Sequence, residues 1–215
     1  MKVNVGCGMT PYSDYVNLDN SFSLRLSKIS LLPEIFFRLK LITELQMKSI
    51  NFYRACKINI RLSDCTKDLL LPNNCADVVY SSHMLEHLGR EEVKPFLKEA
   101  QRVLKVGGIM RIAIPDLEKK IARYNTNKDA DEFIDSLYMI VPNQRSFPQR
   151  LRTAFFGSRY HQWMYDGGSI KKLLENNGFV NVTILLPGET TIPDPGSLDL
   201  CEREEESLYV EGIKR

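Results

Sequence analysis

Short apolar runs alternate with helical patterns along most of this chain, and this alternation constrains the fold more than any other feature of the sequence. Chains of this kind build a largely parallel sheet that is covered by helices. Two of the runs, residues 77–80 and 110–114, are rich in β-branched residues, which is typical of central strands. The sequence therefore predicts an α/β fold.

The apolar runs predict seven strands. In chain order they are Lys2–Val5, Tyr15–Leu18, Lys57–Leu62, Ala76–Ser81, Gly108–Ile114, Val180–Leu186 and Leu208–Lys214. Apolar residues recur at helical spacing over Arg90–Lys105, and we expect Gly107 and Gly108 to end that helix. A second helix is expected over Ser169–Asn177, before Gly178.

Two basic segments interrupt this alternation. Residues 21–62 hold apolar runs that we expect to be helical after Pro33, and residues 136–165 are rich in arginine, proline and aromatic residues. The whole chain has a formal net charge of +2, but the first segment carries +6 and the second +4, which leaves −8 for the rest. The basic residues are Arg25, Lys28, Arg38, Lys40, Lys48, Arg54, Lys57 and Arg61 in the first segment, and Arg145, Arg150, Arg152 and Arg159 in the second.

Two interpretations of the basic segments stay open. They are solvated faces, or they recruit an anionic partner, either a phosphate-linked sugar or an anionic membrane surface. Aromatic residues among the basic ones, such as Phe36 and Phe37, favour a partner that is partly apolar. Nucleic acid is not expected, because no recognition motif accompanies the charge.

Cysteine usage favours a reducing compartment. The five cysteines are scattered and form no C-x-x-C pair, so the sequence predicts neither a disulfide framework nor a thiolate zinc site. The chain enters its first expected strand at once, which leaves no room for a signal peptide, and no apolar stretch is long enough to span a bilayer. We therefore expect a soluble cytoplasmic protein with a single domain over residues 1–215.

Glycines follow the first expected strand, at Gly6 and Gly8. A glycine turn in this place lets a ligand approach the backbone, because no Cβ stands in the way, and ligands bind at the carboxyl ends of strands in open α/β sheets. A dinucleotide fingerprint needs a third glycine at position 11, where this chain has Pro11. The turn therefore argues against a nicotinamide or flavin enzyme.

Carboxylates follow the next two expected strands. Asp19 ends the second strand, where a carboxylate can accept hydrogen bonds from both hydroxyls of a ribose. Asp64 follows the third strand, where a side chain can meet an adenine amino group. For both residues the alternative is a structural role, in a turn or as a helix cap.

The middle of the chain carries a family resemblance. Residues 71–88 read LPNNCADVVYSSHMLEHL, and residues 99–108 read EAQRVLKVGG. Together they resemble the class I S-adenosylmethionine-dependent methyltransferases of the type 11 group. The likeness covers residues 2–19 and 57–116 well and the remainder more loosely. The end of the chain is similar to a subgroup found beside glycosyltransferases of surface-polysaccharide biosynthesis.

The resemblance implies a Rossmann-like seven-stranded sheet with its last strand antiparallel, helices on both faces, and a basic helical insertion after the second strand. It implies S-adenosylmethionine as cofactor, with Gly6 and Gly8 under the methionine part, Asp19 at the ribose and Asp64 at the adenine. Ser82 and His83 correspond to the strand end that lines the cofactor and the substrate mouth.

The sequence departs from the family in three places. Only ten residues separate Gly8 from Asp19, so the first helix of the family is expected to be very short here. Val106 replaces a common proline. Residues 21–56 are longer than the usual connection, and we expect them to form a helical insertion or lid, with a second, substrate-side insertion over residues 136–165.

The histidines carry alternatives. His83-Met84-Leu85-Glu86-His87 also matches H-x-x-E-H, a zinc-peptidase signature, but it directly follows an expected buried strand instead of lying within a long helix. His87 has a packing or helix-start role as its alternative. His161 and Trp163 form either a base or an aromatic wall over the acceptor, or else Trp163 is a core residue and His161 is a surface or hydrogen-bonded residue.

We expect methyl transfer from S-adenosylmethionine to an oxygen or nitrogen of a small or lipid- or phosphate-linked acceptor, which the resemblance suggests is a sugar of polysaccharide biosynthesis. His83 and His161 are the candidate catalytic bases, and no metal is required. The alternatives are a cofactor-binding regulatory protein without catalysis and a zinc hydrolase. Peripheral contact with a membrane is a further hypothesis.

Overall fold

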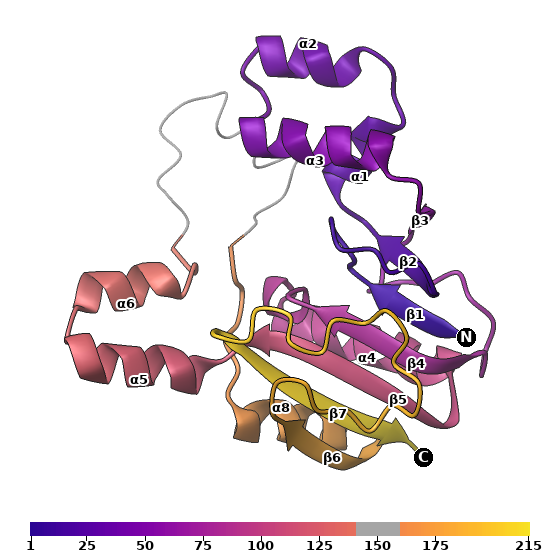
Figure 1. The fold of residues 1–215 in the computed structure, drawn as a ribbon, viewed down its shortest axis with the longest axis vertical. Coiled ribbons are helices and arrows are strands. Elements are labelled where there is room, and N and C mark those ends of the chain that lie inside the picture. Colours follow the sequence, from indigo (N-terminus) through magenta and orange to yellow (C-terminus); the bar gives the residue numbers. More distant parts are fainter. Residues whose placement is uncertain (141–159) are drawn as a thin grey trace.

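A seven-stranded mixed sheet forms the centre of the molecule (Figure 1). The computed structural model describes residues 1–140 and 160–215. The strands are β1 (Lys2–Val5), β2 (Tyr15–Asp19), β3 (Ile60–Leu62), β4 (Ala76–Ser82), β5 (Leu104–Pro115), β6 (Phe179–Leu185) and β7 (Ser207–Lys214), and they lie in the order β3-β2-β1-β4-β5-β7-β6. β1 to β5 pair in parallel, whereas β7 is antiparallel to β5 and to β6. The Rossmann-like sheet with its antiparallel last strand is therefore confirmed.

Helices flank the sheet and extend beyond its edge. The described helices are α1 (Phe22–Ser27), α2 (Leu32–Arg38), α3 (Glu44–Ala55), the 3-10 turn η1 (Leu85–His87), α4 (Arg90–Val103), α5 (Leu117–Asn127), α6 (Ala130–Ser136) and α8 (Gly167–Asn176). In Figure 1, α1, α2 and α3 gather beyond the β3 edge, and α5 and α6 project on the other side. Among the described residues, no helix has the length and apolar content needed to cross a membrane.

One face of the sheet packs on α4 and α8. Phe96 and Leu97 of α4 follow Val93 by three and four residues, and all three are fully buried, as an amphipathic helix on a sheet requires. On β4, Val79 joins this core, while Tyr80 points to the opposite face because successive strand side chains alternate. Ile192, from a segment over residues 186–206 that has no helix or strand, packs with Tyr80 on that opposite face.

A buried ion pair joins the two long strands at the centre. Arg111 of β5 and Glu211 of β7 are register partners, and Nη1 of Arg111 lies 2.7 Å from Oε1 of Glu211. Burial opposes the charged form of Glu211, but hydrogen bonds from Thr190, Thr191 and Arg111 outweigh burial and hold the pKa of Glu211 below its ordinary value. The pair thus fastens the antiparallel strand to the parallel part of the sheet and to the 186–206 segment.

The expected end of the helix at Gly107 and Gly108 is wrong. The helix ends at Val103, and Leu104 already belongs to β5, where it pairs with Ala76. The register then shifts, so that Ile109 pairs with Val78. Gly107 adopts φ +79° in this irregularity, and a Cβ on Gly108 would lie 2.9 Å from the carbonyl oxygen of Lys105. The two glycines therefore serve a bulge in the strand instead of a helix cap.

The very short helix expected between Gly8 and Asp19 is also wrong, because residues 6–14, all of them described, contain no helix. Side-chain hydrogen bonds hold this connection instead. The amide of Asn17 accepts a hydrogen bond from the backbone N–H of Tyr12 at 2.9 Å and donates to the carbonyl of Tyr12 at 2.8 Å. A polar side chain on β2 thus fixes the loop that the family closes with a helix.

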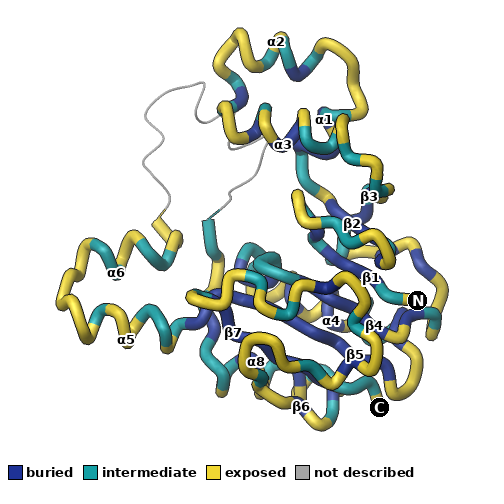
Figure 2. Tube along the Cα trace, in the orientation of Figure 1, coloured by how far each residue is buried: buried dark blue, intermediate teal, exposed yellow. Residues whose placement is uncertain are grey.

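The insertion after β2 is helical, as expected. It has a small core of its own, in which Leu26, Ile42 and Ile50 are buried. Three of the seven residues of α2, Ile35, Phe37 and Arg38, are exposed and Pro33 is buried, and Figure 2 shows this helix as the outermost part of the insertion. The substrate-side insertion expected over residues 136–165 falls largely on residues 141–159, which lie outside the described residues, and so do Arg145, Arg150, Arg152 and Arg159.

Candidate functional site

A cleft of about 910 Å³ lies at the carboxyl ends of the parallel strands, where ligands bind in open α/β sheets. Six of the residues singled out in the sequence line it: Gly6, Gly8, Asp19, Asp64, His83 and His161. Ser82, the last residue of β4, is not among the described residues that line it. The wall also includes Gln46 and Tyr53 of α3, which belong to the insertion. Lys120 of α5 lines the cleft as well.

The glycine turn forms one end of the cleft. Gly6 has φ +71° and packs so closely on Met84 that a Cβ would lie 2.6 Å from Cγ of Met84. Gly8 has φ +52°, and a Cβ there would meet nothing within 4 Å. Gly6 is therefore required by packing, whereas the space beside Gly8 is open for a ligand that approaches the backbone.

Asp19 lies beside this turn and is buried. Its Oδ2 accepts a hydrogen bond from the backbone N–H of Gly8 at 2.8 Å, and its Oδ1 accepts one from the backbone N–H of Ser21. Each carboxylate oxygen has two lone pairs, so both oxygens can accept a further hydrogen bond from a ligand hydroxyl. The geometry fits the ribose role that the sequence predicts.

Asp64 lies in a turn at the wall of the cleft. Its Oδ1 accepts hydrogen bonds from the backbone N–H and the hydroxyl of Thr66, and its Oδ2 lies 2.9 Å from Nζ of Lys67. Burial opposes the charged form, but these hydrogen bonds outweigh it and hold the pKa of Asp64 below its ordinary value. Asp64 thus shapes a turn, and it also lines the cleft.

His83 lines the cleft and is held by a hydrogen bond to Ser207. It follows β4 with φ +45°, and its Nε2 shares a 2.9 Å hydrogen bond with the hydroxyl of Ser207. The Ser207 hydroxyl itself donates to the carbonyl of Glu202, so Nε2 of His83 is the donor. The other ring nitrogen of His83, Nδ1, lies 3.4 Å from Oε1 of Glu86.

Glu86 is the functional candidate that the sequence argument missed as a site residue. It lies on η1, its side chain is 1% exposed, and neither carboxylate oxygen accepts a hydrogen bond from the described residues. Its backbone carbonyl accepts hydrogen bonds from the N–H groups of Gln162 and Trp163, at 2.7 and 3.2 Å. These hydrogen bonds place residues 161–163 against η1. No pattern in the sequence predicts this contact between two distant segments.

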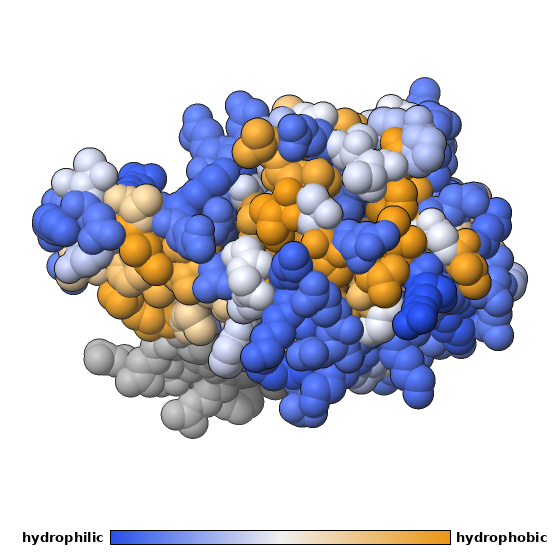
Figure 3. All heavy atoms as spheres, turned by 90° about the horizontal axis from the view of Figure 1, so that it is seen from below, coloured by the Kyte–Doolittle hydropathy of each residue, from blue (hydrophilic) through white to orange (hydrophobic). Residues whose placement is uncertain are grey.

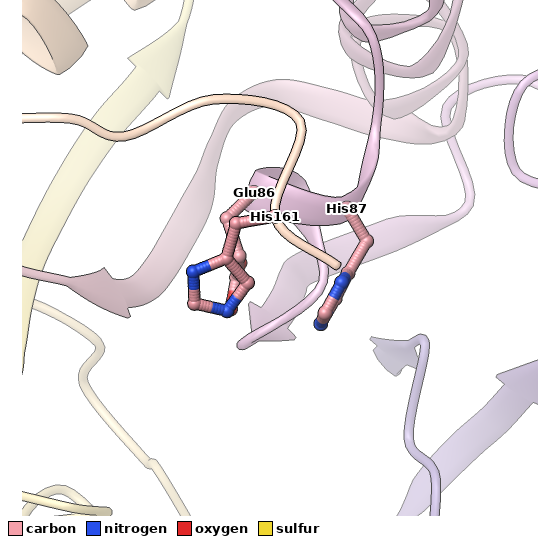
Figure 4. A group of neighbouring side chains, drawn as sticks. All are labelled: Glu86, His87 and His161. Carbon is pink, nitrogen blue, oxygen red and sulfur yellow. The ribbon is translucent and has the colours of Figure 1, made fainter. Parts of the chain in front are cut away.

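Two more imidazoles complete the surroundings of Glu86. Nε2 of His161 lies 4.0 Å from Oε1 of Glu86, and the rings of His87 and His161 are 5.1 Å apart (Figure 4). Burial lowers the pKa of His161, which favours the neutral imidazole. His161 is part of the cleft wall, and its backbone N–H donates a hydrogen bond to the carbonyl of Tyr138 at 2.9 Å.

Trp163 does not occupy the core, contrary to one of its two expected roles. It is 41% exposed, and the guanidinium of Arg90 stacks over its ring at 4.6 Å from the centroid. It is not among the described residues that line the cleft. Asp116, at the end of β5, caps α5 by accepting a hydrogen bond from the N–H of Glu118 at 2.9 Å.

Solved structures of S-adenosylmethionine-dependent methyltransferases share this fold. A SAM-dependent methyltransferase from Archaeoglobus fulgidus superposes with a TM-score of 0.53 at 16% identity, over 99% of this chain and 85% of its own. One from Methanosarcina mazei gives a TM-score of 0.52 at 12% identity, over 99% and 91%. At these identities the likeness concerns the fold alone. A search of curated protein sequences found no match.

The family profile described as a methyltransferase domain matches residues 3–112, half of the chain. That range includes the glycine turn, Asp19, Asp64 and the H-x-x-E-H stretch. The open space beside Gly8 and the buried Asp19 fit the cofactor of that family, because they offer a backbone approach and a hydroxyl acceptor at one end of the cleft. The chain therefore belongs to the methyltransferase-domain family and is an S-adenosylmethionine-dependent methyltransferase.

Proposed function

We propose that this enzyme methylates an oxygen or nitrogen of a small or lipid- or phosphate-linked acceptor, a sugar of polysaccharide biosynthesis being the class that the sequence resemblance favours. The observation that carries the proposal is the lining of the cleft: the glycine turn and Asp19 share one cleft with three histidines, His83, His87 and His161, that surround Glu86. One cleft can thus hold a cofactor and an acceptor together.

Methyl transfer from S-adenosylmethionine requires mainly that the protein align the cofactor and the acceptor. S-adenosylmethionine carries its reactive methyl group on a sulfonium, so the leaving group is a neutral thioether that needs no further activation. The chain binds and orients the partners and excludes water, and such alignment is worth roughly 7–11 kcal/mol. Gly6, Gly8, Asp19, Asp64 and Ser82 are the residues we propose for cofactor binding.

A hydroxyl acceptor must also lose its proton. We propose that His83 and His161 take part in this step, because both line the cleft and both face the buried carboxylate of Glu86. Of the two, His161 is better placed toward the acceptor, since Nε2 of His83 donates to Ser207 and Nδ1 points at Glu86. General-base assistance of this kind contributes about 10²–10⁴-fold in rate.

The surface of the insertion favours an acceptor that is partly apolar or bound to a membrane. Its inner side, with Phe22, Leu45 and Tyr53, lines the cleft, whereas its outer side exposes Leu31, Ile35, Phe37 and Leu39 close to Arg38 and Lys40. An exposed apolar and basic surface next to the cleft suits an anionic lipid surface. We propose that residues 21–56 act as a lid and contact such a surface.

Exposure of apolar side chains is not confined to the insertion. Figure 3 shows another side of the molecule, where apolar and hydrophilic residues are interspersed, and Leu186 after β6 is 67% exposed. Apolar exposure alone therefore does not single out the insertion. The argument for membrane contact depends on the basic residues that accompany it, and a test must change charge.

Calorimetric titration with S-adenosylmethionine and with its demethylated product tests the function. We expect binding by the native protein and its loss in Asp19→Ala. A screen of sugar and lipid-linked acceptors with radiolabelled methyl donor follows. Binding without any turnover would favour a regulatory protein, and a folded protein that binds neither compound would contradict the proposal. A cytoplasmic location is part of the proposal and fits five free cysteines.

A further inference from the structure

We infer that Glu86, His87 and His161 form a site for a divalent transition-metal ion beside the cleft. One ligand atom from each of the three side chains lies within 4.8 Å of the others. Zinc–nitrogen and zinc–oxygen bonds are about 2.0–2.2 Å long, which sets ligand atoms on one ion about 3–4 Å apart. Small rotations of the two imidazole rings would close the remaining gap, and Figure 4 shows the three groups next to one another.

The state of Glu86 is the second, independent observation for this site. Its carboxylate is 1% exposed, and neither oxygen accepts a hydrogen bond from the described residues. An isolated buried carboxylate is costly, and proteins compensate it with a proton, a counter-charge or a metal ion. Nδ1 of His87 and Nδ1 of His161 are likewise buried without a hydrogen bond among the described residues. The cluster is thus rich in donor atoms that need an electron-pair acceptor.

The ligand types select the kind of ion. Two imidazoles and one carboxylate suit Zn²⁺, Co²⁺ or Fe²⁺, whereas Mg²⁺ and Ca²⁺ prefer sites made of oxygen ligands. Three protein ligands leave a coordination position open, as in catalytic zinc sites. His87 and His161 line the cleft, so that open position faces the acceptor.

The site differs from the one that the H-x-x-E-H motif suggests. That motif pairs His83 with His87. In the structure, His83 is fastened to Ser207, and His161 from a distant segment takes its place beside His87. The residues that carry the inference are therefore brought together by the fold, and His83 lies outside the ligand set.

The role of the ion rests on the proposed function. An acceptor hydroxyl bound at the open position has its pKa lowered by the ion, as metal-bound water does. The hydroxyl proton passes to water in the cleft, and the oxygen lone pair forms the O–CH₃ bond. The S–CH₃ bond breaks at the same time, and its electron pair returns to sulfur. His161 then takes part in removing the proton as a ligand of the ion.

Titration of the chelator-treated full chain with Co²⁺, followed by visible absorption and calorimetry, tests the site. We expect one ion per chain with the spectrum of nitrogen and oxygen ligands. Glu86→Gln, His87→Ala and His161→Ala should each weaken binding by more than about 100-fold, because even residues behind metal ligands contribute about 10–100-fold. His83→Ala removes an imidazole that faces Glu86 from behind and should weaken binding less than the three ligand variants do. Asp131→Ala on α6 is the control and should bind Co²⁺ with an affinity close to that of the native chain.

A second measurement guards against variants that fail to fold. Glu86→Gln removes a buried carboxylate that accepts no hydrogen bond from the described residues, so the metal-free variant should be at least as heat-stable as the native chain, while the rise in Tm caused by Co²⁺ disappears. Binding that survives in His161→Ala, or a spectrum of cobalt–thiolate bonds from the free cysteines, overturns the inference. Loss of binding in His83→Ala as well as in His87→Ala would point to the sequence motif instead. S-adenosylmethionine titration without metal reports on the proposed function separately.

Discussion

The carboxylate of Asp19 accepts a hydrogen bond from the backbone N–H of Gly8 at 2.8 Å, so the acid at the end of β2 and the glycine turn after β1 form one unit. Because β1 and β2 are parallel neighbours, their carboxyl ends bring the two motifs together. Asp19 thus orients the turn, and it can at the same time accept hydrogen bonds from a ligand.

Replacement of Asp19 should therefore affect both stability and cofactor binding. Asp19→Ala leaves the N–H groups of Gly8 and Ser21 without their acceptor, and each lost charge-assisted hydrogen bond costs about 1.5–3 kcal/mol. We expect affinity for S-adenosylmethionine to fall by more than about 10-fold, as measured by calorimetry. Asp131→Ala, which removes an exposed carboxylate of α6, is the control and should bind normally. Equal affinity in both variants would contradict this role of Asp19.

The two glycines of the turn should respond differently to alanine. Gly6→Ala brings a Cβ within 2.6 Å of Met84 at φ +71°, whereas Gly8→Ala meets only the backbone cost of a left-handed residue, about 1–2 kcal/mol. Chemical denaturation should show Gly6→Ala as the less stable variant. Met84→Ala removes the closest atom and should restore part of the stability of Gly6→Ala.

Calorimetry completes this comparison. Gly8→Ala places a methyl group in the space where we propose that the cofactor approaches, so it should lose affinity out of proportion to its loss of stability. If Gly8→Ala binds S-adenosylmethionine as the native chain does, the cofactor does not lie against that glycine.

Much of the sheet and of the cofactor end of the cleft could be predicted from local patterns. β1 was predicted to the residue, and the glycine turn and Asp19 lie where parallel strands must place them. The end of α4 could not be predicted, because Gly107 and Gly108 have the same freedom in a bulge as in a helix cap. Whether glycines end a helix or bend a strand depends on the partner strand.

The surroundings of Glu86 show a different limit. Glu86 was visible only as the middle of a histidine motif, and its role depends on His161, which lies 75 residues later. The contact is made by backbone hydrogen bonds from Gln162 and Trp163 to the carbonyl of Glu86. Backbone pairing between irregular segments leaves no trace in side-chain periodicity, so sequence reasoning could propose both histidines but could not place them around one carboxylate.

The central ion pair predicts a pH dependence of stability. The folded-state pKa of Glu211 is lowered relative to the unfolded chain, so its contribution to the free energy of unfolding is complete above the unfolded pKa of about 4.3. It is lost as the pH falls from there through the folded pKa. Denaturation of the native chain should show stability decreasing over this acidic range, and Glu211→Gln should remove that part of the slope.

The same variant should be less stable at neutral pH, by about 3–5 kcal/mol, because the buried guanidinium of Arg111 loses its counter-charge. Glu175→Gln on the exposed side of α8 is the matched control and should change neither the slope nor the stability at pH 7. An unchanged acidic slope in Glu211→Gln would mean that other carboxylates dominate acid unfolding.

Charge reversal on the insertion tests its contact with an anionic surface. Arg38 and Lys40 are exposed beside the apolar residues of α2, and a basic residue close to an anionic bilayer contributes roughly 1 kcal/mol to binding. Arg38→Glu combined with Lys40→Glu should therefore weaken binding to vesicles that contain phosphatidylserine by more than about 10-fold in a sedimentation assay. Binding of S-adenosylmethionine should not change, because neither residue lines the cleft.

The control is Lys171→Glu combined with Lys172→Glu, which makes the same change of charge on exposed residues of α8, away from the insertion (Figure 1). A surface effect of α2 predicts that this second variant binds vesicles as the native chain does. If both double variants lose binding equally, attraction follows the overall charge of the protein and not its orientation on the bilayer. If neither does, the basic residues of the insertion are a solvated face, and the lipid-linked acceptor loses its main structural support.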